Sequence, residues 1–141
     1  MKVTEVRIKL ASNRDDKLQA FASITLDSAF VIRDIKVIRG NEGFFVAMPS
    51  RKLTIRCPDC GTKNHLRAVY CNQCGTELKE RKAPTDERGR TKLHADIAHP
   101  INAECRNMIQ VAIVGEFNRE IERSKQPGYE PAEDEADAGP D

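Results

Sequence analysis

Four of the five cysteines fall in two pairs with the same internal spacing. The pairs are Cys57-Pro-Asp-Cys60 and Cys71-Asn-Gln-Cys74, and a glycine follows each of them. A CxxC segment places two sulfurs on one side of a metal ion, and the glycine after it can adopt the positive φ of a tight turn. Two such pairs complete the tetrahedral shell of four thiolates that zinc prefers. The spacing therefore predicts a structural Zn²⁺ site with no open coordination position for catalysis.

Two other chemistries also use paired cysteines. A redox dithiol needs only one pair, so the second intact pair and the trailing glycines favour a metal. Four thiolates could instead hold an iron–sulfur cluster, and the cysteine pattern alone leaves the identity of the metal open. His65 lies between the pairs and could replace a ligand, although four thiolates suffice. The stretch of about residues 55–78 resembles a zinc ribbon, and metal binding would supply on the order of 10 kcal/mol of its folding free energy.

Other titratable side chains form weaker candidates for chemistry. His94, Asp96 and His99 could form a metal or acid–base cluster, but His99-Pro100 is typical of a turn, and hydrogen bonding at that turn is the plainer explanation. Cys105 begins a predicted helix, where the pKa of a thiol can fall, yet a lone cysteine on an apolar face is usually a small core residue. The sequence contains no glycine-rich phosphate loop, nucleophile elbow or paired catalytic carboxylate motif. We therefore expect no enzymatic activity.

The formal net charge of +1 conceals a strong separation of charge. Residues 50–95 hold eleven basic and five acidic side chains, whereas residues 129–141 hold six acidic side chains and no basic one. The basic stretch could neutralise nucleic-acid phosphates, and its alternative role is an ordinary solvated face. The contact candidates are Arg51, Lys52, Arg56 and Arg67. Because the chain has only seven aromatic residues, we expect contacts with backbones and grooves rather than stacked single strands.

The elements around the cysteine pairs predict an α+β fold. Alternating or β-branched residues and short turns indicate an antiparallel β-sheet meander, and a return to this sheet is expected near residue 95. The predicted strands cover residues 5–10, 18–26, 30–38, 44–48 and 93–97. Asn102 is a plausible N-cap for one C-terminal helix over about residues 102–123, which carries a single apolar stripe. The stripe consists of Cys105, Met108, Ile109, Ala112, Ile113, Phe117 and Ile121.

Hydropathy and cysteine use indicate the compartment. No segment approaches the roughly 20 apolar residues that span a bilayer, and residues 1–10 lack the apolar run of a signal peptide. Tight cysteine pairs are typical of metal sites in a reducing compartment. We therefore expect a cytoplasmic protein without membrane insertion.

Four segments on either side of the cysteine pairs resemble the SpoVG family, the stage V sporulation protein G group. They are ASITLD (22–27), FVIRDIKVIRG (30–40), GFFVAMPS (43–50) and DIAHPIN (96–102). The resemblance implies a SpoVG-like core of residues 1–52 and 91–126. A zinc-ribbon insertion would then occupy 53–80, a charged linker 81–90, and a disordered acidic tail 127–141.

The resemblance also implies function and partners. SpoVG proteins are homodimeric regulators of septation, cell division and sporulation, and they bind DNA and RNA. The basic residues that follow the family's MPS segment correspond to Arg51 and Lys52. The acidic tail could then compete with nucleic acid for the basic stretch, or it could simply be a solubilising terminus. An alternative function is that of a protein-interaction adaptor whose zinc ribbon docks on a division or transcription protein.

Overall fold

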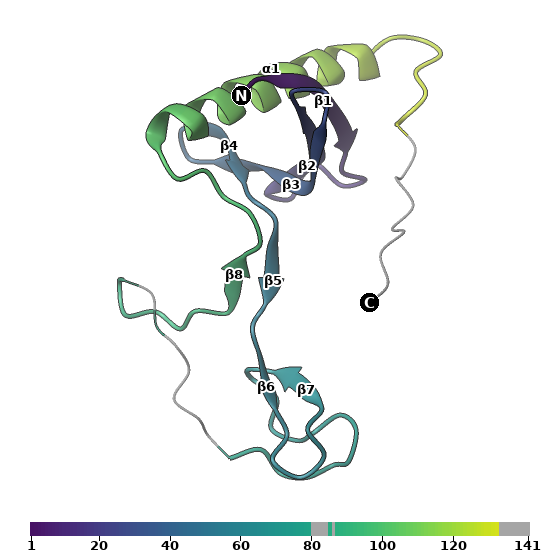
Figure 1. The fold of residues 1–141 in the computed structure, drawn as a ribbon. Coiled ribbons are helices and arrows are strands. Elements are labelled where there is room, and N and C mark those ends of the chain that lie inside the picture. Colours follow the sequence, from purple (N-terminus) through teal and green to yellow (C-terminus); the bar gives the residue numbers. More distant parts are fainter. Residues whose placement is uncertain (80–84, 86, 133–141) are drawn as a thin grey trace. The chain divides into compact units, whose positions relative to one another are not determined.

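The structure, a computed structural model, describes residues 1–79, 85 and 87–132 (Figure 1). Its elements are β1 (Val3–Leu10), β2 (Leu18–Leu26), β3 (Phe30–Gly40), β4 (Gly43–Ala47), β5 (Ser50–Lys52), β6 (Thr54–Arg56), β7 (Lys63–His65), β8 (His94–Asp96) and α1 (Ala103–Ser124). Two compact units are formed, one by residues 1–49 with the chain from residue 98, the other by residues 50–97. Part of the predicted charged linker (81–84 and 86) and most of the predicted acidic tail (133–141) lie outside the described residues.

The first unit confirms the predicted α+β class. Strands β1 to β4 form one antiparallel sheet in the order of the sequence, so the predicted meander is correct. The β2–β3 connection is tight because Asp27 and Ser28 both adopt positive φ angles of about 50°, which suits a two-residue hairpin turn. Gly43, at φ 125°, begins β4 after the second turn.

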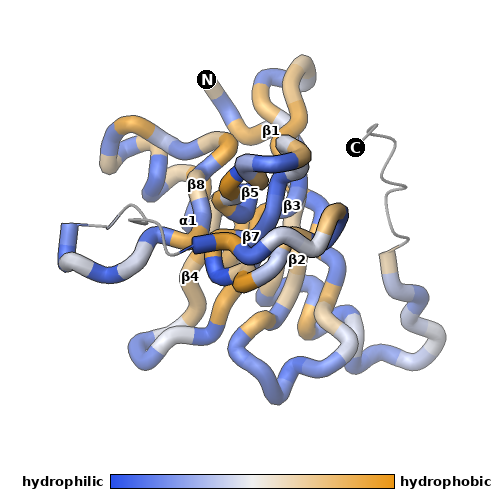
Figure 2. The backbone as a smooth tube through the Cα atoms, turned by 90° about the horizontal axis from the view of Figure 1, so that it is seen from below, coloured by the Kyte–Doolittle hydropathy of each residue, from blue (hydrophilic) through white to orange (hydrophobic). Residues whose placement is uncertain are grey.

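One face of this sheet packs against α1 (Figure 1). The apolar residues that alternate along the strands are buried there, with Ile24, Ile35 and Val37 at 0% exposure. From the helix, Ile113 and Phe117 complete the core. Figure 2 colours the backbone by hydropathy, and both hydrophobic and hydrophilic stretches occur along it.

The N-terminus of α1 has the predicted cap. The side-chain oxygen Oδ1 of Asn102 accepts a hydrogen bond from the backbone N–H of Cys105 at 2.7 Å. Cys105 is half-buried and packs against the sheet core, as its place on the apolar stripe predicts. The cap therefore fixes where the helix begins, and the apolar stripe determines which of its faces meets the sheet.

The expectation that residues 93–97 return to the main sheet is wrong. Strand β8 pairs instead with β5 in a separate two-stranded ladder, with Arg51 opposite Ala95 and Lys52 opposite His94. The edge of the main sheet at β4 is already occupied, because the Gln110 side chain of α1 bonds to the backbone of Phe44 and Val46. A further strand there would have to displace these hydrogen bonds.

The second unit has a very small core. Strands β6 and β7 form a two-stranded ladder, and a bridge joins Tyr70 to Glu77. The buried cluster of this unit consists of Cys57, Cys71 and Leu78, with Ile55 and Ala68 packed against it. Two of the candidate metal ligands are therefore also core residues.

Candidate metal centre

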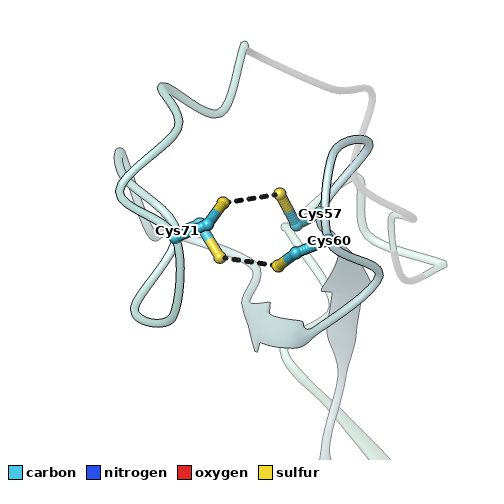
Figure 3. A group of neighbouring side chains, drawn as sticks. Cys57, Cys60 and Cys71 are labelled. Atoms are coloured by element: carbon cyan, nitrogen blue, oxygen red, sulfur yellow. Dashed lines mark hydrogen bonds between the residues drawn. The ribbon is translucent and has the colours of Figure 1, made fainter.

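The four paired cysteines converge on one point (Figure 3). The sulfurs of Cys57, Cys60, Cys71 and Cys74 all lie within 4.8 Å of one another. Two contacts cross between the pairs, from Cys57 to Cys74 and from Cys60 to Cys71, each with a sulfur–sulfur distance of 3.6 Å. Among the described residues this is the only group of three or more cysteine, histidine or acidic side chains close enough to hold a metal.

The two cysteine pairs form equivalent turns. In the first, Gly61 N–H donates to the Cys57 carbonyl at 2.9 Å, and Cys57 N–H donates to the Thr62 carbonyl at 2.9 Å. The second pair repeats both bonds with Gly75, Cys71 and Thr76 at 3.0 and 2.8 Å. Both glycines have positive φ, 76° at Gly61 and 78° at Gly75, so the sequence interpretation of these positions is confirmed.

Backbone N–H groups also point at the sulfurs. Asp59 N–H donates to the sulfur of Cys57 and Gln73 N–H to that of Cys71, both at 3.4 Å. Hydrogen bonds to a sulfur favour its thiolate form. Each pair thus supplies two sulfurs and part of the environment that keeps them charged.

Asn64 is a buried polar residue beside the sulfurs that the sequence interpretation missed. Its exposed fraction is 3%, and its amide Nδ2 donates to the sulfur of Cys71 at 3.5 Å and to the Thr62 carbonyl at 3.1 Å. Its Oδ1 accepts from Asn72 N–H at 2.9 Å, so one side chain joins both cysteine turns. No cysteine-spacing rule points to position 64, because Asn64 lies outside both pairs and two of its three partners are backbone groups.

A second link between the turns runs through Thr76. The sulfur of Cys74 donates to the Thr76 hydroxyl at 3.1 Å, and this hydroxyl donates to the Asp59 carboxylate at 2.7 Å. A sequence signal for this link exists, since both pairs are followed by the same Gly-Thr dipeptide, at 61–62 and 75–76. The repeat marks the threonines as part of the site.

Hydrogen bonding lowers the pKa of two thiols. The pKa of Cys71 falls to about 6 because the backbone N–H of Cys74, the Asn64 amide and the backbone N–H of Gln73 favour its thiolate. The pKa of Cys74 is also lowered, mainly by the side chain and the backbone of Thr76. At Cys57 the backbone hydrogen bonds from Cys60 and Asp59 are outweighed by burial and by the Cys74 and Cys71 sulfurs, so the pKa of this thiol is raised. Metal ligands must be deprotonated, so the contacts at Cys71 in particular favour binding of a cation.

The donor set fits zinc. Four thiolates at Zn–S bonds of about 2.3 Å in a tetrahedron have sulfurs about 3.8 Å apart, close to the two cross-pair distances here. The four thiolates fill this shell without another ligand. The ion would cross-link two turns whose own apolar core is small, which is a structural role.

The remaining titratable candidates are placed elsewhere. His65 is exposed, and its Nδ1 accepts the backbone N–H of Arg67 at 3.1 Å, which is a turn contact rather than ligation. Asp96 and His94 are exposed residues of β8, and His99 is exposed beyond that strand. These three residues do not form a metal-binding group with one another.

All four nucleic-acid candidates are exposed in the second unit. Arg51 and Lys52 lie on β5, Arg56 lies on β6 and Arg67 lies in the loop between β7 and Cys71. Arg56 donates from Nη1 to the Gly61 carbonyl at 3.3 Å, so it lies beside the first cysteine turn. In the described part of the chain, no helix is long and apolar enough to cross a membrane.

Comparison with known proteins finds matches on both sides of the four paired cysteines. The family model described as SpoVG matches residues 1–119. Similar proteins carry the name "Putative septation protein SpoVG". That of Finegoldia magna is 36% identical over 135 residues, covering 96% of this chain and 91% of its own. That of Bacillus pumilus is 38% identical over 132 residues, covering 94% and 97%. That of Anaeromyxobacter sp. strain Fw109-5 is 34% identical over 127 residues, covering 90% and 92%.

The family match extends over the whole four-stranded sheet and most of the helix, and the identities exceed 30% across nearly the full length of the relatives. These findings agree with the four segments that suggested the resemblance. The chain belongs to the SpoVG family of septation proteins.

Proposed function

We propose that this protein is a non-enzymatic SpoVG-type regulator that binds DNA or RNA as a homodimer and acts in septation, cell division or sporulation. The observation that carries the proposal is the family match over residues 1–119, since the relatives are named as septation proteins. The nucleic-acid part of the proposal is supported by the charge of residues 50–95, which carry eleven basic and five acidic side chains. The bound cation would be a structural Zn²⁺.

The β5–β8 ladder supports a role for Arg51 and Lys52. Backbone pairing with Ala95 and His94 holds both residues in extended conformation, and both side chains are exposed. Neighbouring side chains on a strand point to opposite faces, so the two cations would meet different phosphates. Fixing them on a strand lowers the entropy lost when they bind.

The zinc ribbon would place a second pair of cations. Four thiolates around Zn²⁺ leave an excess of roughly two negative charges, which repels phosphate. Arg56 beside the first turn and the exposed Arg67 partly offset that charge. The metal would therefore shape the basic surface, with the arginines making the contacts.

A mobility-shift series on DNA and RNA tests the binding proposal. We expect affinity to fall steeply between about 50 and 200 mM salt, because each neutralised phosphate releases counterions. The double variant Arg51→Ala, Lys52→Ala should reduce the salt slope by about 1 to 2. The matched control is Lys125→Ala, an exposed helix-terminal lysine outside this surface. The proposal would be contradicted if the protein did not bind nucleic acid at low salt, or if Lys125→Ala reduced the salt slope as much as the double variant does.

The adaptor hypothesis is a second candidate with its own observation. Val69 and Tyr70 in the ribbon are 59% and 62% exposed, which makes them suitable anchors for a protein partner. If the ribbon docks on a division or transcription protein, Val69→Ser with Tyr70→Ser should abolish capture of that protein. The same variant should leave nucleic-acid affinity unchanged.

A further inference from the structure

The four-stranded sheet has a second face that α1 does not cover. Its outward residues on the first three strands are basic, hydroxylic or apolar, apart from one glutamate, and many are exposed. They include Glu5, Arg7, Lys9, Phe21, Ser23, Thr25, Val31 and Lys36. Glu5 forms an ion pair with Arg7 at 2.8 Å, and the other charges of this group are positive. This face therefore combines cations with an accessible aromatic ring.

Phe21 lies at the centre of one row across the sheet. Its cross-strand partner on β1 is Lys9, and its partner on β3 is Lys36. Directly opposed residues have Cβ atoms about 4.5 to 5.5 Å apart, so a lysine side chain starts on each side of the ring. Phe21 is 38% exposed, whereas its strand neighbours Ala20 and Ala22 are buried against α1.

A hollow of about 820 Å³ adjoins this row. Phe21, Lys9, Arg7 and Arg33 line it, together with Asp34 from a bulge in β3. Glu116 and Glu120 of α1 also line it, and both accept hydrogen bonds from Arg123, which keeps the pKa of Glu116 below its usual value. The negative charge of these two glutamates is thus partly neutralised.

We propose that this sheet face binds single-stranded nucleic acid, with one base stacked on Phe21 and the adjoining phosphates held by Lys9 and Lys36. The inference deepens the proposed function and rests on it, because it adds a strand-selective surface to a nucleic-acid-binding protein. Base–aromatic stacking beside basic side chains is how proteins hold single strands with little sequence preference.

The geometry favours a single strand over a duplex. A ring on a flat sheet face can stack only on a base that is free on one side, and bases inside a duplex are stacked on both. The expectation from composition alone was the opposite, because aromatic residues are few. Their placement matters more than their number, since one exposed ring between two lysines is enough for one stacked base.

A tryptophan variant gives a direct readout. The chain has no tryptophan, so Phe21→Trp introduces a single fluorophore at the site. The matched control is Phe30→Trp, because Phe30 is 65% exposed at the start of β3 and does not line the hollow. The probes are a ten-nucleotide oligo-dT, the same length of oligo-U, and a duplex of ten base pairs. We expect single strands to quench Phe21→Trp saturably and to leave Phe30→Trp unchanged.

Affinities measured by anisotropy of the labelled strands complete the test. Phe21→Ala should weaken single-strand binding about tenfold, Phe21→Tyr should restore it, and duplex binding should change little. Arg51→Ala with Lys52→Ala should weaken both kinds of binding. If that double variant weakens binding while Phe21→Ala has no effect, the sheet-face inference is overturned and the proposed function stands.

Two further outcomes also decide the inference. Phe21→Ala could lower the molecular mass in solution without lowering the affinity for single strands. This face would then be a contact between two copies of the chain, and the inference would be overturned. Wild-type protein that binds neither strand nor duplex would overturn both proposals. If Phe21→Ala weakens single-strand binding and the Arg51, Lys52 double variant does not, the result supports binding at the sheet face and contradicts binding by the two β5 residues.

Discussion

At the residue scale, the side chain of Asn64 connects the two cysteine turns. It is 3% exposed and uses both ends of its amide, donating to Cys71 Sγ and the Thr62 carbonyl and accepting from Asn72 N–H. A buried polar group is costly unless its hydrogen bonds are satisfied, and here the partners belong to both halves of the metal site. Asn64 therefore orients a ligand without being one.

Asn64→Ala should weaken zinc binding by about 10- to 100-fold, the usual effect of removing a partner that orients a ligand. It also leaves the Asn72 N–H without its partner, at about 1 to 3 kcal/mol if water cannot reach it, whereas the Thr62 carbonyl keeps its hydrogen bond from Cys57 N–H. Competition for zinc against a chromophoric chelator measures the affinity. The control is Asn72→Ala, because Asn72 is exposed and joins this network through its backbone N–H. Equal affinities in the two variants would contradict the assigned role.

The clustering of the four cysteines was predictable from sequence and the neighbours of their sulfurs were not, for a physical reason. Ligand spacing is a local property of the chain, and the CxxC-Gly turns form as it predicts. Asn64 comes from a strand outside both pairs, and its position depends on how the turns fold against β7. The contact residues Arg51, Lys52, Arg56 and Arg67 remain predictions, because exposure is common to most charged side chains.

At the scale of elements, Gln110 determines where the main sheet ends. Its Oε1 accepts from Val46 N–H and its Nε2 donates to the Phe44 carbonyl, both at 3.0 Å. A strand added to β4 would use the same backbone groups, so the glutamine blocks an edge that would otherwise be open to pairing. The helix thus contributes polar edge protection as well as its apolar stripe.

Gln110→Ala should destabilise the protein by about 1 kcal/mol, because two hydrogen bonds of the β4 backbone are exchanged for water. The free edge should also promote self-association at high protein concentration. Thermal unfolding and light scattering measure the two effects. Gln126→Ala beyond the end of α1 serves as the control, since Gln126 is exposed. Unchanged unfolding together with unchanged scattering would show that the edge does not need this side chain.

The periodic elements were predictable from sequence, and the pairing partner of the 93–97 segment was not. Strong alternation places β2 and β3 close to their predicted positions, and the stripe and cap place α1. Strand β8 has only three residues, too few for a period to identify its partner. Its pairing with β5 depends on the chain being brought back to residue 50, which is a long-range property.

At the scale of the whole molecule, the two units differ in what holds them together. The first unit buries ten apolar residues between sheet and helix, so its stability comes from hydrophobic packing. The second buries Cys57, Cys71 and Leu78, which is too little apolar surface to offset the entropy of ordering the chain. We therefore expect a metal ion on the four cysteines to supply most of its folding free energy.

Chelation of zinc should therefore unfold the second unit and leave the first folded. We expect the helical circular-dichroism signal of α1 to persist in excess chelator, since α1 packs on the sheet of its own unit. Amide hydrogen exchange should lose protection at β6 and β7 and keep it at β2 and β3. Readdition of Zn²⁺ should restore protection at β6 and β7.

Cys60→Ser with Cys74→Ser provides the matched control for chelation, because both residues are exposed ligands and neither belongs to the buried cluster of the second unit. The variant should show the exchange pattern of the chelated wild type even with zinc present, since two ligands cannot close a tetrahedral shell. Loss of the α1 signal on chelation would show that the first unit depends on the metal. Protection retained at β6 and β7 in both samples would instead show that the cysteine turns fold without it, and the metal would then be a ligand of a preformed unit.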